Sequence, residues 1–139
     1  MRILALDVGT KRIGVALSDE LLITAQGFDT IYRTELNRDL SVIKNMAIKN
    51  GVTEIVAGLP LNMDGTHSAK TREVIEFVDQ LLKVVQIPVN TWDERLTSLQ
   101  ADRFLLEADM SRMKRKKLND KLAAQILLQG YLDSRKKGR

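Results

Sequence analysis

The first seventeen residues place one carboxylate between two short apolar runs, and this stretch constrains the fold more than any other. Residues 3–6 are apolar, Asp7 follows them, and a second largely apolar run covers residues 13–17 after Gly9. Two short β-prone runs joined by a glycine-containing connection predict a β-hairpin. A carboxylate with apolar neighbours is rarely left in a sheet unless it is paired, hydrogen-bonded or bound to a cation. Partners for Asp7 are therefore expected from other parts of the chain.

Composition excludes several classes of protein. The chain has 139 residues, of which 44% are hydrophobic and 29% charged, and this length predicts one domain, residues 1–139. No apolar run approaches the length of a membrane span, and Asp7 interrupts the N-terminal run too early for a signal peptide. Without cysteine there is no disulfide framework, and any zinc site would lack thiolate ligands. These features predict a cytoplasmic protein.

The net charge of +4 is unevenly distributed. Residues 111–139 contain ten Lys or Arg and two Asp or Glu, a net charge of about +8. Residues 1–110 contain twelve Lys or Arg and sixteen Asp or Glu, a net charge of about −4. A basic C-terminal quarter favours a polyanionic partner, most often nucleic acid, although a solvated charged run has the same composition. The candidate phosphate contacts in this quarter are Arg112, Lys114, Arg115, Lys116 and Lys117.

Periodicity and turn signals predict nine elements in the order βββαβαβαα. Apolar residues recur at steps of four, three and four between Leu36 and Ala47, which indicates an amphipathic helix, and Gly51 suits its C-terminal end. In chain order, the expected elements are strands at 3–6, 13–17 and 24–33, a helix at 36–47, a strand at 53–57, a helix at 68–82, a strand at 89–92, and helices at 97–108 and 119–132.

This order predicts an α/β fold with one mixed sheet. The first three strands form a meander, and two helix-linked strands extend the same five-stranded sheet in parallel, with helices on its faces. In open α/β sheets, sites form at the carboxyl ends of the strands where the strand order reverses. Asp7 ends the first strand and Glu94 follows the fifth. The topology therefore brings Asp7 and Glu94 to one edge of the sheet.

A third acid, Asp120, comes from the first turn of the last predicted helix. It lies off the polar stripe of that helix and in line with Ala124 and Leu127, on an apolar face that should pack against the sheet. An acid in the first turn also suits the helix dipole without any further role. Together with Asp7 and Glu94, however, it would complete a set of three carboxylates.

Three converging carboxylates, in a chain with one His and no Cys, favour Mg²⁺ or Mn²⁺. Such ions polarise phosphate and activate a water molecule, often as a pair about 3.5–4 Å apart, so this set suits hydrolysis of phosphodiester bonds. Lys11, Arg12 and Arg95 lie close to these acids in sequence and are candidate phosphate contacts. The predicted metal-binding and catalytic residues are Asp7, Glu94 and Asp120.

Four motifs, in this order, resemble the YqgF/RuvX family. They are LDVGTKRIG at 6–14, GLPLNMDG at 58–65, DERLTS at 93–98 and NDKLAA at 119–124. The resemblance spans nearly the whole chain. It implies a ribonuclease H-like fold and an activity either as Holliday junction resolvase or as nuclease trimming the 5′ end of pre-16S ribosomal RNA in ribosome biogenesis.

The resemblance also implies that Asp7, Glu94 and Asp120 match the catalytic acids of the family. Many ribonuclease H-like nucleases use four acids, and Asp93 would point away from Glu94 if the strand persists. The number of metal ions therefore stays open. RNA or DNA as substrate, endo- or exonucleolytic cleavage, and monomer or dimer also stay open.

Two other functions are compatible with the same residues. The segment from Asp7 to Thr10 also resembles the first phosphate loop of sugar kinases and actin-like ATPases, which sandwich nucleotide between two domains of this fold. A non-catalytic RNA-binding factor that assembles with the precursor of the small ribosomal subunit is the other alternative.

Four features carry both a structural and a functional interpretation. His67 is either an exposed loop residue or a general acid or base, and Ser68 is either a helix cap or a nucleophile. The segment from Gly58 to Gly65 is either a plain connection, a clasp on a phosphate backbone or a lid. Trp92 is either a core residue or a surface for base stacking.

Overall fold

The computed structural model describes residues 1–96 and 112–137, and the side chains of residues 1–96 and 120–135. In chain order the elements are β1 (Arg2–Val8), β2 (Arg12–Ser18), β3 (Ala25–Tyr32), α1 (Leu36–Lys49), β4 (Val52–Leu59), α2 (Ala69–Leu82), β5 (Val89–Asp93), the 3₁₀ turn η1 (Glu94–Leu96) and α4 (Arg112–Lys137). The predicted helix at 97–108 lies outside the described residues. Every other predicted element is confirmed.

The five strands form one sheet in the order β3-β2-β1-β4-β5. Strands β1, β2 and β3 pair in antiparallel fashion, whereas β4 is parallel to both β1 and β5. The predicted mixed sheet, a meander extended by two parallel strands, is therefore confirmed. In the described part of the chain, no helix combines the length and apolar character that a membrane span requires.

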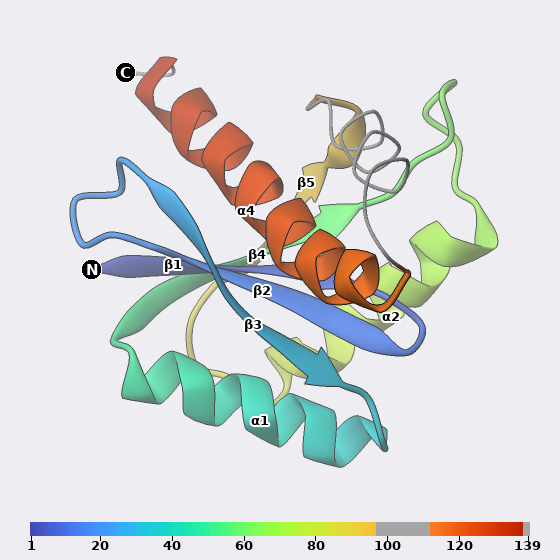
Figure 1. Ribbon diagram of the computed structural model, residues 1–139, viewed down its shortest axis with the longest axis horizontal. Helices are drawn as coiled ribbons and strands as arrows, with labels where there is room; N and C mark the ends of the chain where they lie inside the picture. Colours follow the sequence, from blue (N-terminus) through green and yellow to red (C-terminus); the bar gives the residue numbers. More distant parts are fainter. Residues whose placement is uncertain (97–111, 138–139) are drawn as a thin grey trace.

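The two faces of the sheet are covered by different helices (Figure 1). Alternate residues of β1 point to opposite faces. Leu4 and Leu6 join a buried cluster with α1 and α2, whereas Ile3 and Ala5 join a second cluster with α4. The same alternation puts Asp7 on the face that α4 covers.

Small residues allow α4 to lie close to the strands beneath it. A Cβ on Gly14 of β2 would overlap the backbone carbonyl of Asp120, and a Cβ on Gly27 of β3 would lie 3.1 Å from Lys121 Cβ. Because neither glycine has a side chain, the backbone of α4 can rest almost directly on β2 and β3. The N-terminal half of α4 is thereby positioned against the carboxyl end of β1.

Helix α4 begins earlier than predicted, at Arg112 instead of residue 119. Residues 112–118 consist of Arg, Lys, Met and Leu, which are good helix formers, and no Gly or Pro interrupts them. These residues lack the apolar periodicity of an amphipathic helix, so the sequence alone predicts a loop there. The predicted basic cluster is thus part of the first turns of α4.

Helix α2 packs one face against the core. Phe77 is 4% exposed and packs with Val74 and Leu81, whereas Leu82 is 46% exposed. Ser68 caps the helix, because its hydroxyl accepts a hydrogen bond from the Thr71 backbone N–H at 3.2 Å. The capping interpretation of Ser68 is therefore confirmed.

Candidate active site at the carboxyl ends of the strands

Asp7 lies near the carboxyl end of β1, partly buried, with a glycine on each side of it. Its cross-strand partner on β2 is Gly14. On the β4 side, Leu6 pairs with Ala57, so the next residues of the two strands, Asp7 and Gly58, follow side by side. The missing side chains leave space on both sides of the Asp7 carboxylate for groups that other elements deliver.

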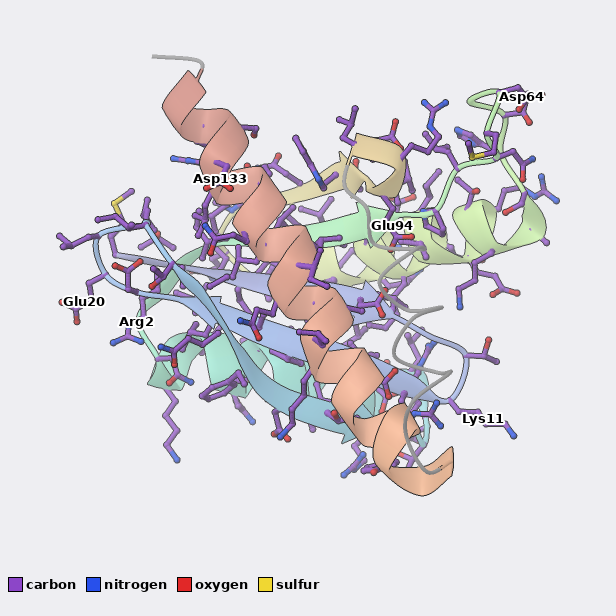
Figure 2. All side chains as sticks on the ribbon, turned by 45° about the horizontal axis from the view of Figure 1, so that its top comes forward. Arg2, Lys11, Glu20, Asp64, Glu94 and Asp133 are labelled. Carbon is purple, nitrogen blue, oxygen red and sulfur yellow. The ribbon has the colours of Figure 1, made fainter. Side chains whose placement is uncertain are left out.

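Glu94 occupies the space above Gly58. It opens η1 directly after β5 and is only 6% exposed (Figure 2). A Cβ built on Gly58 would lie 2.7 Å from Glu94 Oε1 and would overlap Cδ1 of Leu127 on α4. The Glu94 carboxylate therefore lies directly over the Gly58 Cα, on the same face of the sheet as Asp7.

Asp120 occupies the space above Gly14, on the other side of Asp7. Its backbone carbonyl lies where a Gly14 Cβ would be, and its side chain is 19% exposed. Arg12 Nε donates a hydrogen bond to Asp120 Oδ2 at 2.6 Å. The three predicted acids thus gather from β1, η1 and α4 at one edge of the sheet.

The Arg12–Asp120 ion pair was not expected from the sequence, in which Arg12 is a candidate phosphate contact. The two residues are 108 positions apart, and a cation beside a turn gives no sign of which anion it meets. Within the described ranges, no group of three or more His, Cys, Asp or Glu side chains is arranged to hold a metal ion. The Asp120 carboxylate is bonded to a guanidinium instead.

Arg95 is also engaged with protein groups. Its guanidinium donates to Asp93 at 2.8 and 3.1 Å, and Nη1 donates to the Met63 backbone carbonyl at 3.1 Å. This hydrogen bonding lowers the pKa of the Asp93 carboxyl and raises the pKa of Arg95. Asp93 therefore serves as the partner of Arg95 in this arrangement. Lys11 is exposed at the turn between β1 and β2 (Figure 2).

The basic cluster lies in the first turns of α4, which lead directly to Asp120. The backbone of these turns is described, whereas the side chains lie outside the described residues. The cluster consists of Arg112, Lys114, Arg115, Lys116 and Lys117. Because the cluster lies at the start of the helix that carries Asp120, phosphate binding by its side chains stays a prediction.

The segment between β4 and α2 is a hydrogen-bonded loop that projects beyond the strands (Figure 1). Asn62 N–H donates to the Thr66 carbonyl at 3.0 Å, and Gly65, with φ +85°, donates to Asn62 at 2.8 Å. Asp64 accepts hydrogen bonds from Thr66, which lower the pKa of its carboxyl. His67 is exposed in this loop.

Trp92 packs against the second buried cluster. Its ring meets Tyr131 of α4 edge to face, with centroids 5.6 Å apart. Such contacts are typical of aromatic pairs in cores. The core interpretation of Trp92 is therefore the one that the structure bears out.

The order and direction of the strands, with helices on both faces, define a ribonuclease H-like fold. The RuvC of Thermus thermophilus in complex with a Holliday junction superposes with a TM-score of 0.62 at 12% identity, over 99% of this chain and 96% of that chain. A Fowlpox virus resolvase in complex with Holliday junction DNA gives a TM-score of 0.56 at 12% identity, over 96% and 98%. At these identities the likeness shows the fold alone.

The chain belongs to the RuvX family, whose model, described as Holliday junction resolvase, matches residues 1–134. Relatives named "Putative pre-16S rRNA nuclease" include one from Clostridium kluyveri, 52% identical over 133 residues, which are 96% of this chain and 97% of the relative. Another, from Caldanaerobacter subterraneus subsp. tengcongensis, is 53% identical over 137 residues, 98% and 99% of the two chains. The predicted resemblance is confirmed.

Proposed function

We propose that this protein is a metal-dependent nuclease that hydrolyses phosphodiester bonds in structured nucleic acid, with Asp7, Glu94 and Asp120 as its catalytic acids. The observation that carries the proposal is the row formed by Gly14, Asp7 and Gly58. The Glu94 carboxylate lies over Gly58 and the backbone of Asp120 lies over Gly14, so three acidic residues from distant parts of the chain lie on one face of the sheet.

The donor set fits Mg²⁺ or Mn²⁺. Carboxylate oxygens are the ligands that these hard cations prefer, and the Glu94 carboxylate is buried, at 6% exposure. When bound, the ion would polarise the phosphate and lower the pKa of an attacking water. Asp7, Glu94 and Asp120 would hold it, and the Arg12 guanidinium neutralises Asp120 until then.

The basic residues around the edge are proposed to hold the nucleic-acid backbone. Such phosphate contacts position the substrate and carry little sequence information. Lys11 is exposed on the turn after β1. Arg95 directly follows Glu94 and binds the Met63 carbonyl in the loop after β4. The cluster at the start of α4 would extend this surface away from Asp120.

We propose the precursor of 16S ribosomal RNA as substrate and its 5′ end as the site of cleavage, in the cytoplasm. The support is the similarity to relatives of that name at 52% and 53% identity, whereas the resolvase structures are only 12% identical. A four-way DNA junction is the competing substrate, because the family model is described as Holliday junction resolvase.

The proposal is tested by cleavage assays on two substrates, an RNA with the 5′ leader of 16S ribosomal RNA and a four-way DNA junction. We expect the RNA to be cut in Mg²⁺ or Mn²⁺ and cleavage to fall to background in excess EDTA, because removal of the ion leaves the phosphate unpolarised and the attacking water without its lowered pKa. Re-addition of Mn²⁺ should restore the rate. Equal cleavage with and without EDTA would contradict the metal dependence, and cleavage of the junction alone would contradict the choice of RNA.

A second candidate function is a non-catalytic RNA-binding factor in ribosome assembly. The observation that favours it is the Arg12–Asp120 ion pair, which neutralises one acid of the site in this structure. In cells that lack the protein, full complementation by both Asp7→Asn and Glu94→Gln would decide for this function. Loss of complementation by variants that fold normally would decide for the nuclease.

A further inference from the structure

The turn between β1 and β2 is held by hydrogen bonds to its main chain. Gly9 N–H donates to the Arg12 carbonyl at 2.8 Å, and a Cβ on Gly9 would lie 2.5 Å from that same oxygen. The Gly9 carbonyl accepts a hydrogen bond from Arg33 Nη1 at 2.9 Å. The Lys11 carbonyl accepts one from the Arg33 backbone N–H at 2.9 Å. Arg33, which directly follows β3, therefore binds the turn at two points.

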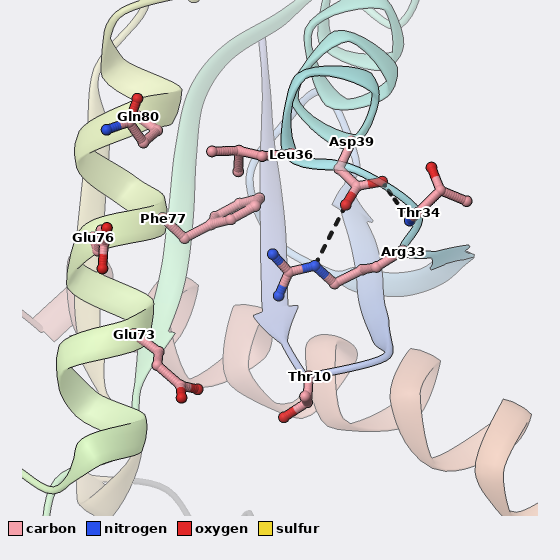
Figure 3. Close-up of a pocket in the computed structure, with 9 residues that line it drawn as sticks. All are labelled: Thr10, Arg33, Thr34, Leu36, Asp39, Glu73, Glu76, Phe77 and Gln80. Atoms are coloured by element: carbon pink, nitrogen blue, oxygen red, sulfur yellow. Dashed lines mark hydrogen bonds and ion pairs between the residues drawn. The ribbon is translucent and has the colours of Figure 1, made fainter.

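Two further contacts, with Asp39 and Phe77, fix the Arg33 side chain in this position (Figure 3). Its Nε lies 3.4 Å from Asp39 Oδ2, and its guanidinium carbon lies 5.1 Å from the centroid of the Phe77 ring. Asp39 is 1% exposed and also accepts a hydrogen bond from the Thr34 backbone N–H at 3.2 Å. The planar fork of an arginine can meet Asp39 and Gly9 at once, whereas a lysine offers one point charge.

A cavity of about 450 Å³ opens beside this arrangement, between α1 and α2. Thr10 lies at one end of the cavity, and the Arg33 side chain remains 26% exposed. Arg33 is therefore not enclosed by tight packing on this side. Its orientation depends on Asp39, Phe77 and the Gly9 carbonyl.

We infer that Arg33 is a positioning residue for the proposed active site, acting from the face of the sheet opposite to α4. By holding the carbonyls of Gly9 and Lys11, it fixes the turn that carries Lys11 and Arg12. Arg12 in turn meets Asp120, which extends the effect to the acid that α4 delivers. The contacts described for Arg33 are with Asp39, Phe77 and the carbonyls of the turn, and the inference rests on the proposed function.

Arg38 offers a matched control. It lies 3.8 Å from the same carboxylate, Asp39, and is 54% exposed, but its other hydrogen bonds go to Tyr32 and Thr34. Loss of Arg38 therefore removes a cation next to Asp39 and leaves both carbonyl contacts of the turn in place. Any effect that is specific to the turn should appear only in Arg33 variants.

The first measurement is amide hydrogen exchange by NMR on the full chain without substrate. In Arg33→Ala and Arg33→Lys, the Gly9 amide, which donates to Arg12, should exchange roughly tenfold faster, because the turn opens locally when its carbonyl contact is lost. Arg33→Lys keeps a cation beside Asp39 and Phe77, so it should fold even if Arg33→Ala does not. Arg38→Ala should exchange at the wild-type rate.

The second measurement is single-turnover cleavage in Mg²⁺ with the precursor RNA. Arg33→Lys should cut about tenfold more slowly, while the substrate concentration for half-maximal rate changes by less than about twofold, because misplacement affects the reaction more than binding. Wild-type exchange and rate in Arg33→Lys would overturn the inference, as would an equal loss in Arg38→Ala. If the wild-type protein cuts no substrate, the proposed function fails, and the exchange measurement still decides the role of Arg33.

Discussion

Replacing Gly14 by alanine is expected to destabilise the protein by about 3 kcal/mol, the upper end of the usual cost of overpacking. The new Cβ would overlap the Asp120 carbonyl oxygen and lie 2.5 Å from its carbon and 3.1 Å from its Cα. These are backbone atoms of a helix, so no side-chain rotation can relieve the clash. Helix α4 would have to move away from β2, which opens the buried cluster that contains Leu127 and Leu128.

Gly51→Ala is the matched control for this prediction. Gly51 has φ +65°, and a Cβ there would meet nothing within 4 Å, so only backbone strain opposes the change. That strain costs about 1 kcal/mol once the lower entropy of the unfolded chain is counted. Urea unfolding of both variants measures the difference. Equal stabilities of Gly14→Ala and Gly51→Ala would show that α4 does not rest on β2 as described.

The sheet is the part of the fold that the sequence predicts best, because its signals are local. Two short apolar runs with a glycine-containing connection between them are sufficient for the hairpin, and because alternate residues of a strand point to opposite faces, Asp7 shares the face of Ile3 and Ala5. The parallel strands follow from the helices that link them. From this topology alone, the approach of Asp7 and Glu94 could be predicted without knowing any contact between them.

The contacts of the cations could not be predicted in the same way. Three arginines near the candidate site bind groups of the protein itself. Arg12 binds Asp120, Arg33 binds the Gly9 carbonyl in the turn after β1, and Arg95 binds Asp93. In the sequence, a cation that binds phosphate and one that binds a distant carboxylate look the same, since only the fold decides which anion is near. The start of α4 was missed for a similar reason, because a run of basic residues without apolar spacing has the composition of both a loop and an exposed helix.

Two glycines, Gly14 and Gly58, link the predicted sheet to the contacts that only the structure reveals. Gly14 and Gly58 are neutral features in the sequence, one inside a strand and one after a predicted strand. In the structure they are the two positions beside Asp7, and each lies beneath another acid. Glycine within a strand commonly marks close approach of another group. Here it marks the places where Asp120 and Glu94 reach the sheet.

The largest functional effect is expected from Asp7→Asn, which should lower the rate of cleavage in Mg²⁺ at least about 100-fold. Loss of a group that only supports a metal ligand already costs roughly 10–100-fold, and loss of a ligand should exceed this range. The substitution keeps the size of the side chain but removes a negative charge that the proposed ion requires. Single-turnover cleavage of the precursor RNA measures the effect, and thermal unfolding shows whether the variant is folded.

Asp133→Asn is the matched control for this prediction, because Asp133 is an exposed acid on the same helix as Asp120 and bonds only to Gln129 in the described residues (Figure 2). It should cut at the wild-type rate. Glu94→Gln should behave like Asp7→Asn, since both acids lie on the same face of the sheet around Gly58. Asp7→Asn with wild-type cleavage and normal stability would exclude the proposed mechanism. An equal loss in Asp133→Asn would mean that general charge, and not the row of acids, determines the rate.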